Sequence, residues 1–362
     1  MVANKTILIS PLDWGLGHAT RCMPIIDLLQ QLGAKILLAG NGYSLNLLKD
    51  KYPQIPFFEL PAYNIQYPVG KNAAVQTLLQ SPKVLRTMKD EHLEIARIVS
   101  ENKVDVIISD NRWGAWNKNC KNIFLCHQVA VQAPSPFGWM NSFLLKFHLR
   151  LIRNFDALWI PDETGENNLS GKLSHGLKIP IPYSFIGIQS RFTNLTTTTS
   201  IPATEGQYRI VALLSGAEPQ RTHFEWQLKN ELIKTDERFL LVSGRTDKKE
   251  YTKEGKLDIV SYMQAEELLP FLQQAEIIIC RAGYSTLMDL AVLGKKAILI
   301  PTPGQTEQEY LARELSQKEM AVAVLQEQFD LQAAMEKINK IKGFEKMAAN
   351  KDLLLNAMEK DL

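Results

Sequence analysis

The sequence predicts an α/β fold with two Rossmann-like, doubly wound domains that face each other across a cleft. Short apolar runs of strand length recur through the 362 residues, and stretches with helical spacing lie between them. The apolar runs are continuous rather than alternating, which is typical of strands buried on both faces of a parallel sheet. Alternation of such strands with helices favours doubly wound domains, and the chain is long enough for two.

The first domain is predicted over residues 1–193. Helical spacing is seen over 22–32 and 85–100, and Pro24 suits an early position in a helix. Its expected strands are 6–10, 35–40, 56–60, 104–109, 122–127, 157–161 and 184–188.

A polar, Thr-rich stretch at 194–207 has no core pattern and is predicted to be a linker. The alternation then restarts, which predicts a second α/β domain over 208–345 and a C-terminal helix over 346–362. In two tandem domains of this kind, a ligand would bind between the carboxyl ends of their strands. The expected strands of the second domain are 209–216, 239–244, 257–262, 276–280, 296–301 and 321–325.

Composition excludes several classes of protein. The net charge is +2, so no large positive field predicts binding to nucleic acid. The four cysteines have no paired short spacing and mostly lie in or beside apolar runs, which predicts buried thiols and no metal site. The N-terminus lacks a signal-peptide pattern and no run of about 18 apolar residues occurs, so a cytoplasmic protein is expected.

The loop after the first strand, PLDWGLGHATR at 11–21, is the first candidate site. Gly15 and Gly17 allow a tight turn and a close approach of a ligand to the backbone. His18 falls at the junction with a helix, where it would face the cleft. The three-glycine Rossmann pattern is incomplete, so a glycine turn followed by a surface histidine is the alternative.

The second candidate site is CRAGYSTLMDLAVLGKKAILIPTPGQTEQ at 280–308. Gly283 is expected to permit an unusual backbone angle, and Ser285 or Thr286 to cap the following helix, whose start favours a phosphate. Ser285 and Asp289 share a helix face and are about 6 Å apart along the axis, which suits the step from a phosphate to a ribose. Asp289 could accept hydrogen bonds from both ribose hydroxyls, or lie on a solvated helix face.

Polar residues after other strands of the second domain could complete this site. The loop after 296–301 offers groups that can bond to sugar hydroxyls, namely Thr302, Gln305, Glu307, Gln308 and Glu309. A polar loop that caps the next helix is the alternative. Ser215 and Gly216, in another strand-to-glycine turn, could contact a diphosphate, and Arg245 could lie nearby.

These motifs resemble those of GT-B glycosyltransferases, and most closely those of glycosyltransferase family 28. The resemblance covers both domains and is strongest over 275–312, while GLGHATR is similar to the family's glycine loop with its histidine. It implies a UDP-sugar donor, inversion at the anomeric carbon, and no metal or other cofactor. Asp13, Trp14 and Glu309 depart from the family's pattern, which leaves the donor sugar, N-acetylglucosamine or another hexose, and the acceptor open.

The resemblance also implies roles for individual residues. The first domain would bind the acceptor and the second the nucleotide sugar, with Asp289 on the ribose, the backbone of Met263 beside the uracil, and Gln308 on the donor sugar. The resemblance also places Gly283, Tyr284 and Ser285 against the diphosphate and Ser215 and Gly216 on its other side. Four further residues are candidates for the nucleotide-sugar site on their position alone, namely Arg245, Arg281, Thr286 and Gln305. The resemblance places His18 beside the acceptor. Gly15, Gly17, Asp110 and His127 are further candidates for the acceptor side because of their positions after strands of the first domain.

An inverting transfer needs a base that takes the proton from the acceptor hydroxyl. His18 is the first candidate, because an unperturbed histidine titrates near neutrality. Asp13 is the second, as the base or as the carboxylate that orients His18. Asp110 and His127 end strands that face the cleft, and a structural hydrogen-bonding role is as plausible for them as a chemical one.

One segment suggests contact with lipid. Residues 136–155 combine aromatic and aliphatic side chains with Lys146, Arg150 and Arg153. Such a segment could lie on an anionic membrane surface, or line a groove for a lipid-linked acceptor of the kind common in the resembled family. An ordinary helix whose apolar side is core is an equal alternative.

Three other functions stay open at this point. A UDP-sugar epimerase of the same architecture would use several carboxylates near the sugar, and this chain has fewer in the matching loops. A nucleotide-sugar-binding subunit would need a partner chain for catalysis, and the presence of His18 and Asp13 argues against it. A dinucleotide-dependent oxidoreductase would need a third glycine and an acidic residue after the second strand, where AGNGYS stands.

Overall fold

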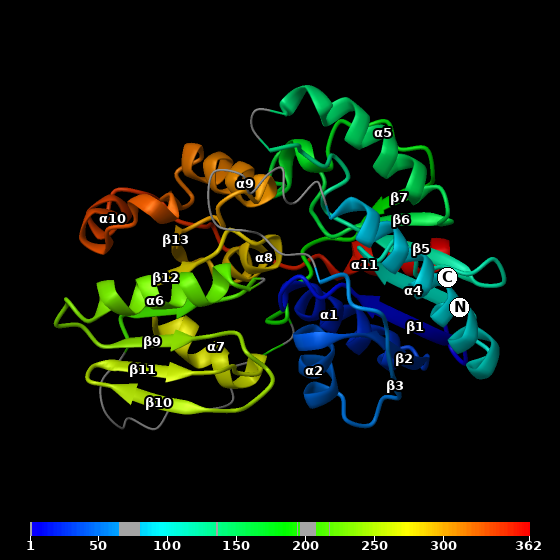
Figure 1. Ribbon diagram of the computed structural model, residues 1–362, viewed down its shortest axis with the longest axis horizontal. Helices are drawn as coiled ribbons and strands as arrows, with labels where there is room; N and C mark the ends of the chain where they lie inside the picture. The colour runs from blue at the N-terminus through cyan, green and yellow to red at the C-terminus, as the bar shows by residue number, and fades with distance from the viewer. Residues whose placement is uncertain (1, 65–79, 135–136, 194, 196–207, 217) are drawn as a thin grey trace.

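The computed structural model describes residues 2–64, 80–134, 137–193, 195, 208–216 and 218–362. Within these ranges the chain forms two sheets, each in its own lobe (Figure 1). The predicted α/β fold with two Rossmann-like domains is therefore confirmed. Of the predicted linker at 194–207, all but residue 195 lies outside the described residues.

The N-terminal sheet has seven strands in the order β3-β2-β1-β4-β5-β6-β7, and all its described pairs are parallel. The strand order reverses at β1, so the carboxyl ends of β1 and β4 open a crevice where ligands bind in such sheets. The strands are β1 (Thr6–Pro11), β2 (Lys35–Gly40), β3 (Phe57–Glu59), β4 (Val106–Asp110), β5 (Lys121–Leu125), β6 (Ala157–Ile160) and β7 (Tyr183–Phe185). The helices are α1 (Gly17–Gln31), α2 (Gly42–Lys51), α4 (Ser81–Asn102) and α5 (Asn141–Ile152).

The C-terminal sheet has the order β10-β11-β9-β8-β12-β13-β14. Only β10 among its described strands is antiparallel to its neighbour. The sequence did not predict β10, because its residues are exposed and polar and form no apolar run. The strands are β8 (Ile210–Leu213), β9 (Phe239–Val242), β10 (Tyr251–Glu254), β11 (Leu257–Val260), β12 (Ile277–Cys280), β13 (Lys296–Leu299) and β14 (Val322–Ala323). The helices that follow β8 along the chain are α6 (Gln220–Leu232), α7 (Ala265–Gln274), α8 (Tyr284–Leu293), α9 (Thr306–Gln317), α10 (Leu331–Ile338) and α11 (Lys351–Asp361).

Helix α1 begins earlier than predicted. It starts at Gly17 rather than at residue 22, so Pro24 lies well inside the helix. The first turn contains Gly17, a poor helix former, and polar residues, so the apolar pattern did not extend to it. The earlier start places His18 and Arg21 one turn apart on the same helix face.

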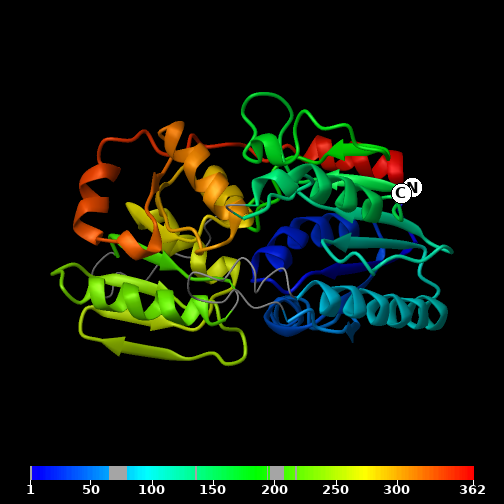
Figure 2. The ribbon, with the colours of Figure 1, turned by 45° about the horizontal axis from the view of Figure 1, so that its top comes forward.

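Helix α11 belongs to the first lobe although it follows the second in sequence (Figures 1 and 2). Leu354, Ala357 and Met358 are buried in the same apolar cluster as residues of β1 and α1. Nε1 of Trp159, on β6, donates a hydrogen bond of 2.8 Å to Oδ2 of Asp361. The chain therefore passes between the two domains twice. No helix in the described ranges is long and apolar enough to cross a membrane.

Candidate active site

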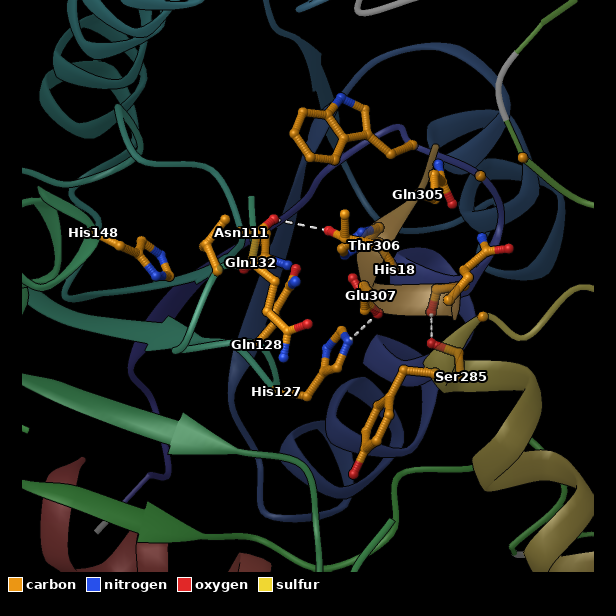
Figure 3. A pocket seen from close by; sticks show the side chains of 18 of the residues that line it. His18, Asn111, His127, Gln128, Gln132, His148, Ser285, Gln305, Thr306 and Glu307 are labelled. Atoms are coloured by element: carbon orange, nitrogen blue, oxygen red, sulfur yellow. Dashed lines mark hydrogen bonds and ion pairs between the residues drawn. The ribbon is translucent and has the colours of Figure 1, made fainter. Parts of the chain in front are cut away.

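A cavity of about 450 Å³ lies between the two domains, at the carboxyl ends of their central strands (Figure 3). The second domain contributes the Ser215–Gly216 turn and the starts of α8 and α9. The first domain contributes the loop after β1, the end of β5 and the facing sides of α4 and α5. The cavity therefore has a polar wall on one domain and a largely apolar wall on the other.

The glycine turns of the two domains touch at the edge of this cavity. Gly15 and Gly216 have φ angles of +110° and +112°, which only glycine adopts readily. A Cβ atom on Gly15 would lie 3.2 Å from the backbone nitrogen of Gly216, and one on Gly17 would lie 3.0 Å from Oγ of Ser285. Glycine at these positions therefore allows the loops to meet without side chains between them.

The start of α8 differs from the prediction in two ways. Gly283 is the residue before the helix, with an ordinary extended conformation at φ −74° and ψ 134°, so the expected unusual angle is wrong. Neither Ser285 nor Thr286 caps the helix. Instead, Oγ of Ser285 donates a 2.7 Å hydrogen bond to the carbonyl oxygen of Gly17 in the other domain. Gly283, Tyr284, Ser285 and Thr286 all line the cavity.

The start of α9 supplies amide side chains to the same wall. Oε1 of Gln308 accepts a 2.8 Å hydrogen bond from the backbone nitrogen of Thr302, which leaves its NH2 group as a donor for a ligand. Gln305 also lines the cavity. Glu309 does not, because it is exposed and accepts a bond of 3.0 Å from the backbone nitrogen of Gly304. Glu309 therefore stabilises the loop instead of lining the cavity.

His18 and Asp110 form a hydrogen-bonded pair at the first-domain side of the cavity. Nδ1 of His18 lies 3.0 Å from Oδ1 of Asp110. Arg21, from the next turn of α1, donates hydrogen bonds to the same carboxylate from its Nε, at 2.8 Å, and from its Nη2. Burial alone would raise the pKa of Asp110, but the Arg21 guanidinium and His18 hold it far below its usual range. Asp110 is therefore an ionised carboxylate that orients the imidazole of His18.

Arg21 connects this pair to the second domain. Its Nη1 lies 2.8 Å from Nδ1 of His127. Nε2 of His127 in turn lies 2.6 Å from Oε1 of Glu307, at the start of α9 (Figure 3). A guanidinium can only donate, so Nδ1 accepts and the proton is on Nε2. Burial lowers the pKa of His127, consistent with a neutral ring. The ring also stacks on Tyr284, with centroids 4.1 Å apart.

The comparisons with known proteins identify the type of enzyme. The model of the glycosyltransferase family 28 C-terminal domain matches residues 220–360. This chain is a GT-B glycosyltransferase that resembles family 28. A glycosyltransferase of Methanosarcina mazei, itself uncharacterized, is 22% identical over 313 residues, which cover 82% of this chain and 79% of the relative.

Further relatives extend the likeness to nearly the whole chain. The UDP-N-acetylglucosamine--N-acetylmuramyl-(pentapeptide) pyrophosphoryl-undecaprenol N-acetylglucosamine transferase of Histophilus somni is 23% identical over 347 residues, covering 92% of this chain and 88% of that protein. The spinosyn rhamnosyltransferase SpnG, solved with thymidine diphosphate, aligns over 97% of this chain and 96% of its own, with a TM-score of 0.60 and 14% identity. MurG of Acinetobacter baumannii aligns over 98% and 93%, with a TM-score of 0.52 and 15% identity. The solved structures of SpnG and MurG therefore share the fold of this chain.

Asp13 does not occupy the position that the sequence suggested. Its Oδ1 accepts a 2.9 Å hydrogen bond from the backbone nitrogen of Ser44, in the first turn of α2, and burial raises its pKa. Asp13 does not line the cavity, and the carboxylate in contact with His18 is Asp110. The prediction that Asp13 orients His18 is therefore wrong, because its carboxylate is used to satisfy the start of α2.

Asp289 is buried at the junction between the domains and does not line the cavity. Oδ1 accepts a 2.7 Å hydrogen bond from Oγ of Ser190, and Oδ2 lies 3.1 Å from Nε of Arg191. Burial raises its pKa, and Arg191 opposes that shift. The alternative of a solvated helix face is wrong. The contact with a ribose stays a prediction, because the carboxylate is held here by the segment that ends the first domain.

Three other predicted nucleotide-binding residues lie outside the cavity lining. Arg281 is buried and donates to the carbonyl oxygens of Ile300 and Gln220, each at 3.1 Å, and burial lowers its pKa to about 9. It therefore holds segments of the second domain together instead of reaching the cavity. Arg245 is partly exposed near Glu250, and Met263 packs against the apolar core, so their nucleotide contacts stay predictions.

Arg21 was not predicted as a site residue, although its spacing from His18 would have suggested it. A buried cluster of polar side chains behind the apolar wall of the cavity was not predicted either. Arg112 and Glu91 form a fully buried ion pair, and Oε2 of Glu91 accepts bonds from the hydroxyl of Tyr63 at 2.7 Å and the backbone nitrogen of Gly114 at 2.9 Å. No local pattern could show this cluster, because its members lie far apart in the sequence.

The cysteines and the acidic and histidine side chains form no metal centre among the described residues, where no group of three or more of them is arranged to hold an ion. Cys22, Cys126 and Cys280 are free and buried, and Cys120 is free and partly buried. Burial raises the pKa of Cys126 and of Cys280 to about 12. Burial therefore keeps the thiols of Cys126 and Cys280 protonated at neutral pH.

Proposed function

We propose that the glycosyltransferase moves a sugar from a UDP-sugar to a hydroxyl group of its acceptor, with inversion and without a bound metal. The observation that carries the proposal is that His18, which is paired with Asp110, lines the same cavity as the start of α8 and the Ser215–Gly216 turn. An acceptor and an activated donor could therefore meet between a base and a phosphate-binding helix start.

His18 is the proposed base. A proton on its Nδ1 would be donated to Asp110 at 3.0 Å, which leaves Nε2 with a free lone pair. Nε2 could then take the proton of the acceptor hydroxyl as the new glycosidic bond forms. Arg21 would act as a positioning residue, because its Nε donates a 2.8 Å hydrogen bond to Oδ2 of Asp110. Its Nη2 also lies 2.9 Å from Nδ1 of His18, and since a guanidinium only donates, the proposed tautomer requires Nη2 to donate to Asp110 and not to Nδ1.

The second domain supports departure of the diphosphate. The transition state of glycosyl transfer is oxocarbenium-like, and negative charge grows on the leaving group. Backbone N–H groups at the start of α8 and in the turn at Gly216 can stabilise that charge without a metal. Gln305 and Gln308 would bind hydroxyl groups of the donor sugar. Uridine as the nucleotide, and N-acetylglucosamine as one candidate sugar, are suggested by the named substrates of the relatives.

The first domain supports a lipophilic acceptor and contact with a membrane. Leu144, Phe147 and Leu151 of α5 line the cavity, while Trp139 and Phe143, at the start of the same helical segment, are 79% and 65% exposed. Lys146 and Arg150 are exposed nearby. We therefore include in the proposal a peripheral contact of residues 137–155 with an anionic membrane, at its cytoplasmic face, and a lipid-linked acceptor as one candidate.

The first test is nucleotide binding by the purified protein, measured as a thermal shift with UDP, thymidine diphosphate and GDP in the presence of EDTA. A nucleotide at a hundredfold over its Kd should add about 2.7 kcal/mol to the free energy of unfolding. We expect UDP to give the largest shift. Stabilisation by thymidine diphosphate or GDP alone, or by UDP only after metal is added, would overturn this part of the proposal.

The second test is the reaction itself. UDP-sugars are incubated with candidate acceptors, UDP release is measured, and the anomeric configuration of the product is read by NMR. His18→Ala should lose about 10²–10⁴-fold in turnover, the contribution of a general base, and still bind UDP. A retained anomeric configuration would refute inversion.

The membrane contact is tested by co-sedimentation with vesicles that contain phosphatidylglycerol. Trp139→Ser combined with Phe143→Ser should reduce binding, and lower salt should increase it. Trp226→Ser is the matched control, because Trp226 is also exposed but lies on α6 of the other domain. Equal binding by the double variant and the control would refute a membrane contact through α5.

A further inference from the structure

The apolar half of the cavity contains three buried polar atoms without a hydrogen-bond partner among the described residues. They are Nε1 of Trp14, Nε1 of Trp113 and Nε2 of His148, and all three residues line the cavity. Buried polar atoms are nearly always paired in folded proteins, because an unmet one costs stability. A ligand bound in this cavity could supply partners for these atoms.

His148 contributes an acceptor. Its Nδ1 lies 2.9 Å from the carbonyl oxygen of Val129, which can only accept, so the proton is on Nδ1 and Nε2 has the lone pair. The residue is 4% exposed, and burial lowers its pKa, which keeps the ring neutral. Figure 3 shows His148 on the side of the pocket remote from Ser285. This hydrogen-bond acceptor therefore lies on the opposite side of the pocket from the start of α8, where the sugar donor is proposed to bind.

Trp113 and Trp14 contribute donors. The ring of Trp113 meets that of His148 edge-on, with centroids 6.0 Å apart, and that of Trp14 with centroids 6.1 Å apart. An indole N–H can only donate, whereas Nε2 of His148 can only accept. A hydroxyl group within reach of both atoms would satisfy both, since it donates and accepts. A carboxylate or phosphate oxygen could not donate to Nε2, and an ammonium group could not accept from an indole.

The surroundings define the rest of the ligand. Val84, Met88, Leu144 and Phe147 line the same half of the cavity. Their side chains offer only apolar contact, so the body of the ligand should be hydrocarbon or aromatic. Few polar groups in a mostly apolar pocket fix the orientation of the ligand that it binds.

We propose that Trp113 and His148 form an acceptor-recognition subsite for a second hydroxyl group, distinct from the one that reacts at His18. The acceptor is then an apolar molecule with at least two hydroxyl groups, one held at Trp113 and His148 and one presented to the base. Trp14 supplies a further donor beside the first. This inference rests on the proposed function only in taking His18 as the reacting end of the acceptor site.

The experiment is calorimetric titration of the full chain, without donor, with two matched pairs of probes. The pairs are para,para′-biphenyldiol with para-phenylphenol, and estradiol with its analogue that lacks the ring-D hydroxyl. Loss of one neutral hydrogen bond corresponds to about a fivefold weaker affinity. We therefore expect the diol of at least one pair to bind about fivefold or more tightly than its mono-ol.

Two variants locate the effect. Trp113→Phe keeps a ring but removes the N–H, and His148→Asn keeps a donor for the carbonyl oxygen of Val129 but removes Nε2. The preference for the diol should fall in both, because each variant removes one of the two hydrogen bonds to the hydroxyl group, and it should persist unchanged in Trp226→Phe, the control for loss of an exposed indole N–H. A reduced preference in both variants supports the subsite. An unchanged preference in either variant, equal binding of diols and mono-ols by the original protein, or no binding of any probe would overturn it.

Failure of this inference is distinguishable from failure of the proposed function. UDP binding is measured on the same preparations by thermal shift, and it also shows that the variants fold. If UDP binds and no diol is preferred, the subsite is refuted while the donor site stands. If the diols are preferred and UDP does not bind, the donor proposal is refuted while the subsite stands.

Discussion

Replacement of Asp110 by asparagine is the sharpest test of the arrangement around His18. Asp110 is fully buried, and its carboxylate accepts hydrogen bonds from His18 and from Arg21, which is itself 1% exposed. Asparagine has nearly the same shape but no charge, and its amide presents a donor as well as an acceptor. The substitution therefore removes the counter-charge of Arg21 and the fixed acceptor of His18 together.

Two effects of different size should follow. Loss of one partner of a buried ion pair costs about 3–5 kcal/mol in the free energy of unfolding, because the guanidinium of Arg21 stays buried and uncompensated. The amide that Asp110→Asn introduces could donate to Nδ1 of His18, which would move the proton to Nε2 and disable the base. Turnover per folded molecule should then fall by about 10²–10⁴-fold, as for loss of the base itself.

The assay is the rate of UDP release at saturating donor, corrected for the folded fraction, in a double-mutant cycle. If Asp110 acts through His18, then His18→Ala, Asp110→Asn and the double variant should lose activity by similar factors. Asp258→Asn is a matched control. That carboxylate is also buried and pairs with an arginine, Arg238, at 2.9 Å, but it does not line the cavity, so its loss should cost stability without a comparable loss of turnover.

Two results would refute this mechanism. One is turnover by Asp110→Asn within about twofold of the original enzyme per folded molecule, because a general base contributes far more. The other is multiplication of the losses in the double variant, which would mean that Asp110 and His18 act independently.

The remaining predictions concern stability. Gly114→Ala should cost about 1–3 kcal/mol in urea denaturation, because the new Cβ would lie 2.2 Å from the carbonyl oxygen of Met88; an unchanged midpoint would contradict the packing described at Gly114. Gly283→Ala is the control and should leave stability within about 0.5 kcal/mol, because nothing lies within 4 Å of its Cβ position. Stability should also fall as the pH decreases below about 6.5, since burial lowers the pKa of His127 and His148 and the unfolded chain then binds protons that the folded chain does not. The fall should be smaller in His148→Asn, and a flat profile between about pH 7.5 and 5.5 would show that these rings are not held neutral.

Most of the fold could be predicted from the sequence because buried parallel strands are continuous apolar runs. The runs at 6–10 and 277–280 lie in strands whose residues are all buried. β10 could not be predicted, because it pairs along the sheet edge through its backbone while its side chains stay exposed. The start of α1 was missed for a related reason, since its first turn depends on contacts with the other domain and not on an apolar pattern.

The site was predictable only in its local features. The glycine turns and His18 could be predicted because they depend on backbone freedom and on position after a strand. The partnership of His18 with Asp110, and that of His127 with Glu307, join residues that are 92 and 180 positions apart. Spacing on a helix placed Asp289 on one face of α8 but could not show that Ser190 and Arg191 cover that face.

The position of α11 has a consequence for the order in which the protein folds during synthesis. The core of the first domain includes Leu354, Ala357 and Met358, which the ribosome adds only after the whole second sheet has been made. Until then the surface around Trp159 that receives Asp361 is open to solvent. The second domain can therefore complete its core first. The apolar side chains of the first domain that pack on α11 stay uncovered until that helix, encoded nearly two hundred codons after β6, has been synthesised.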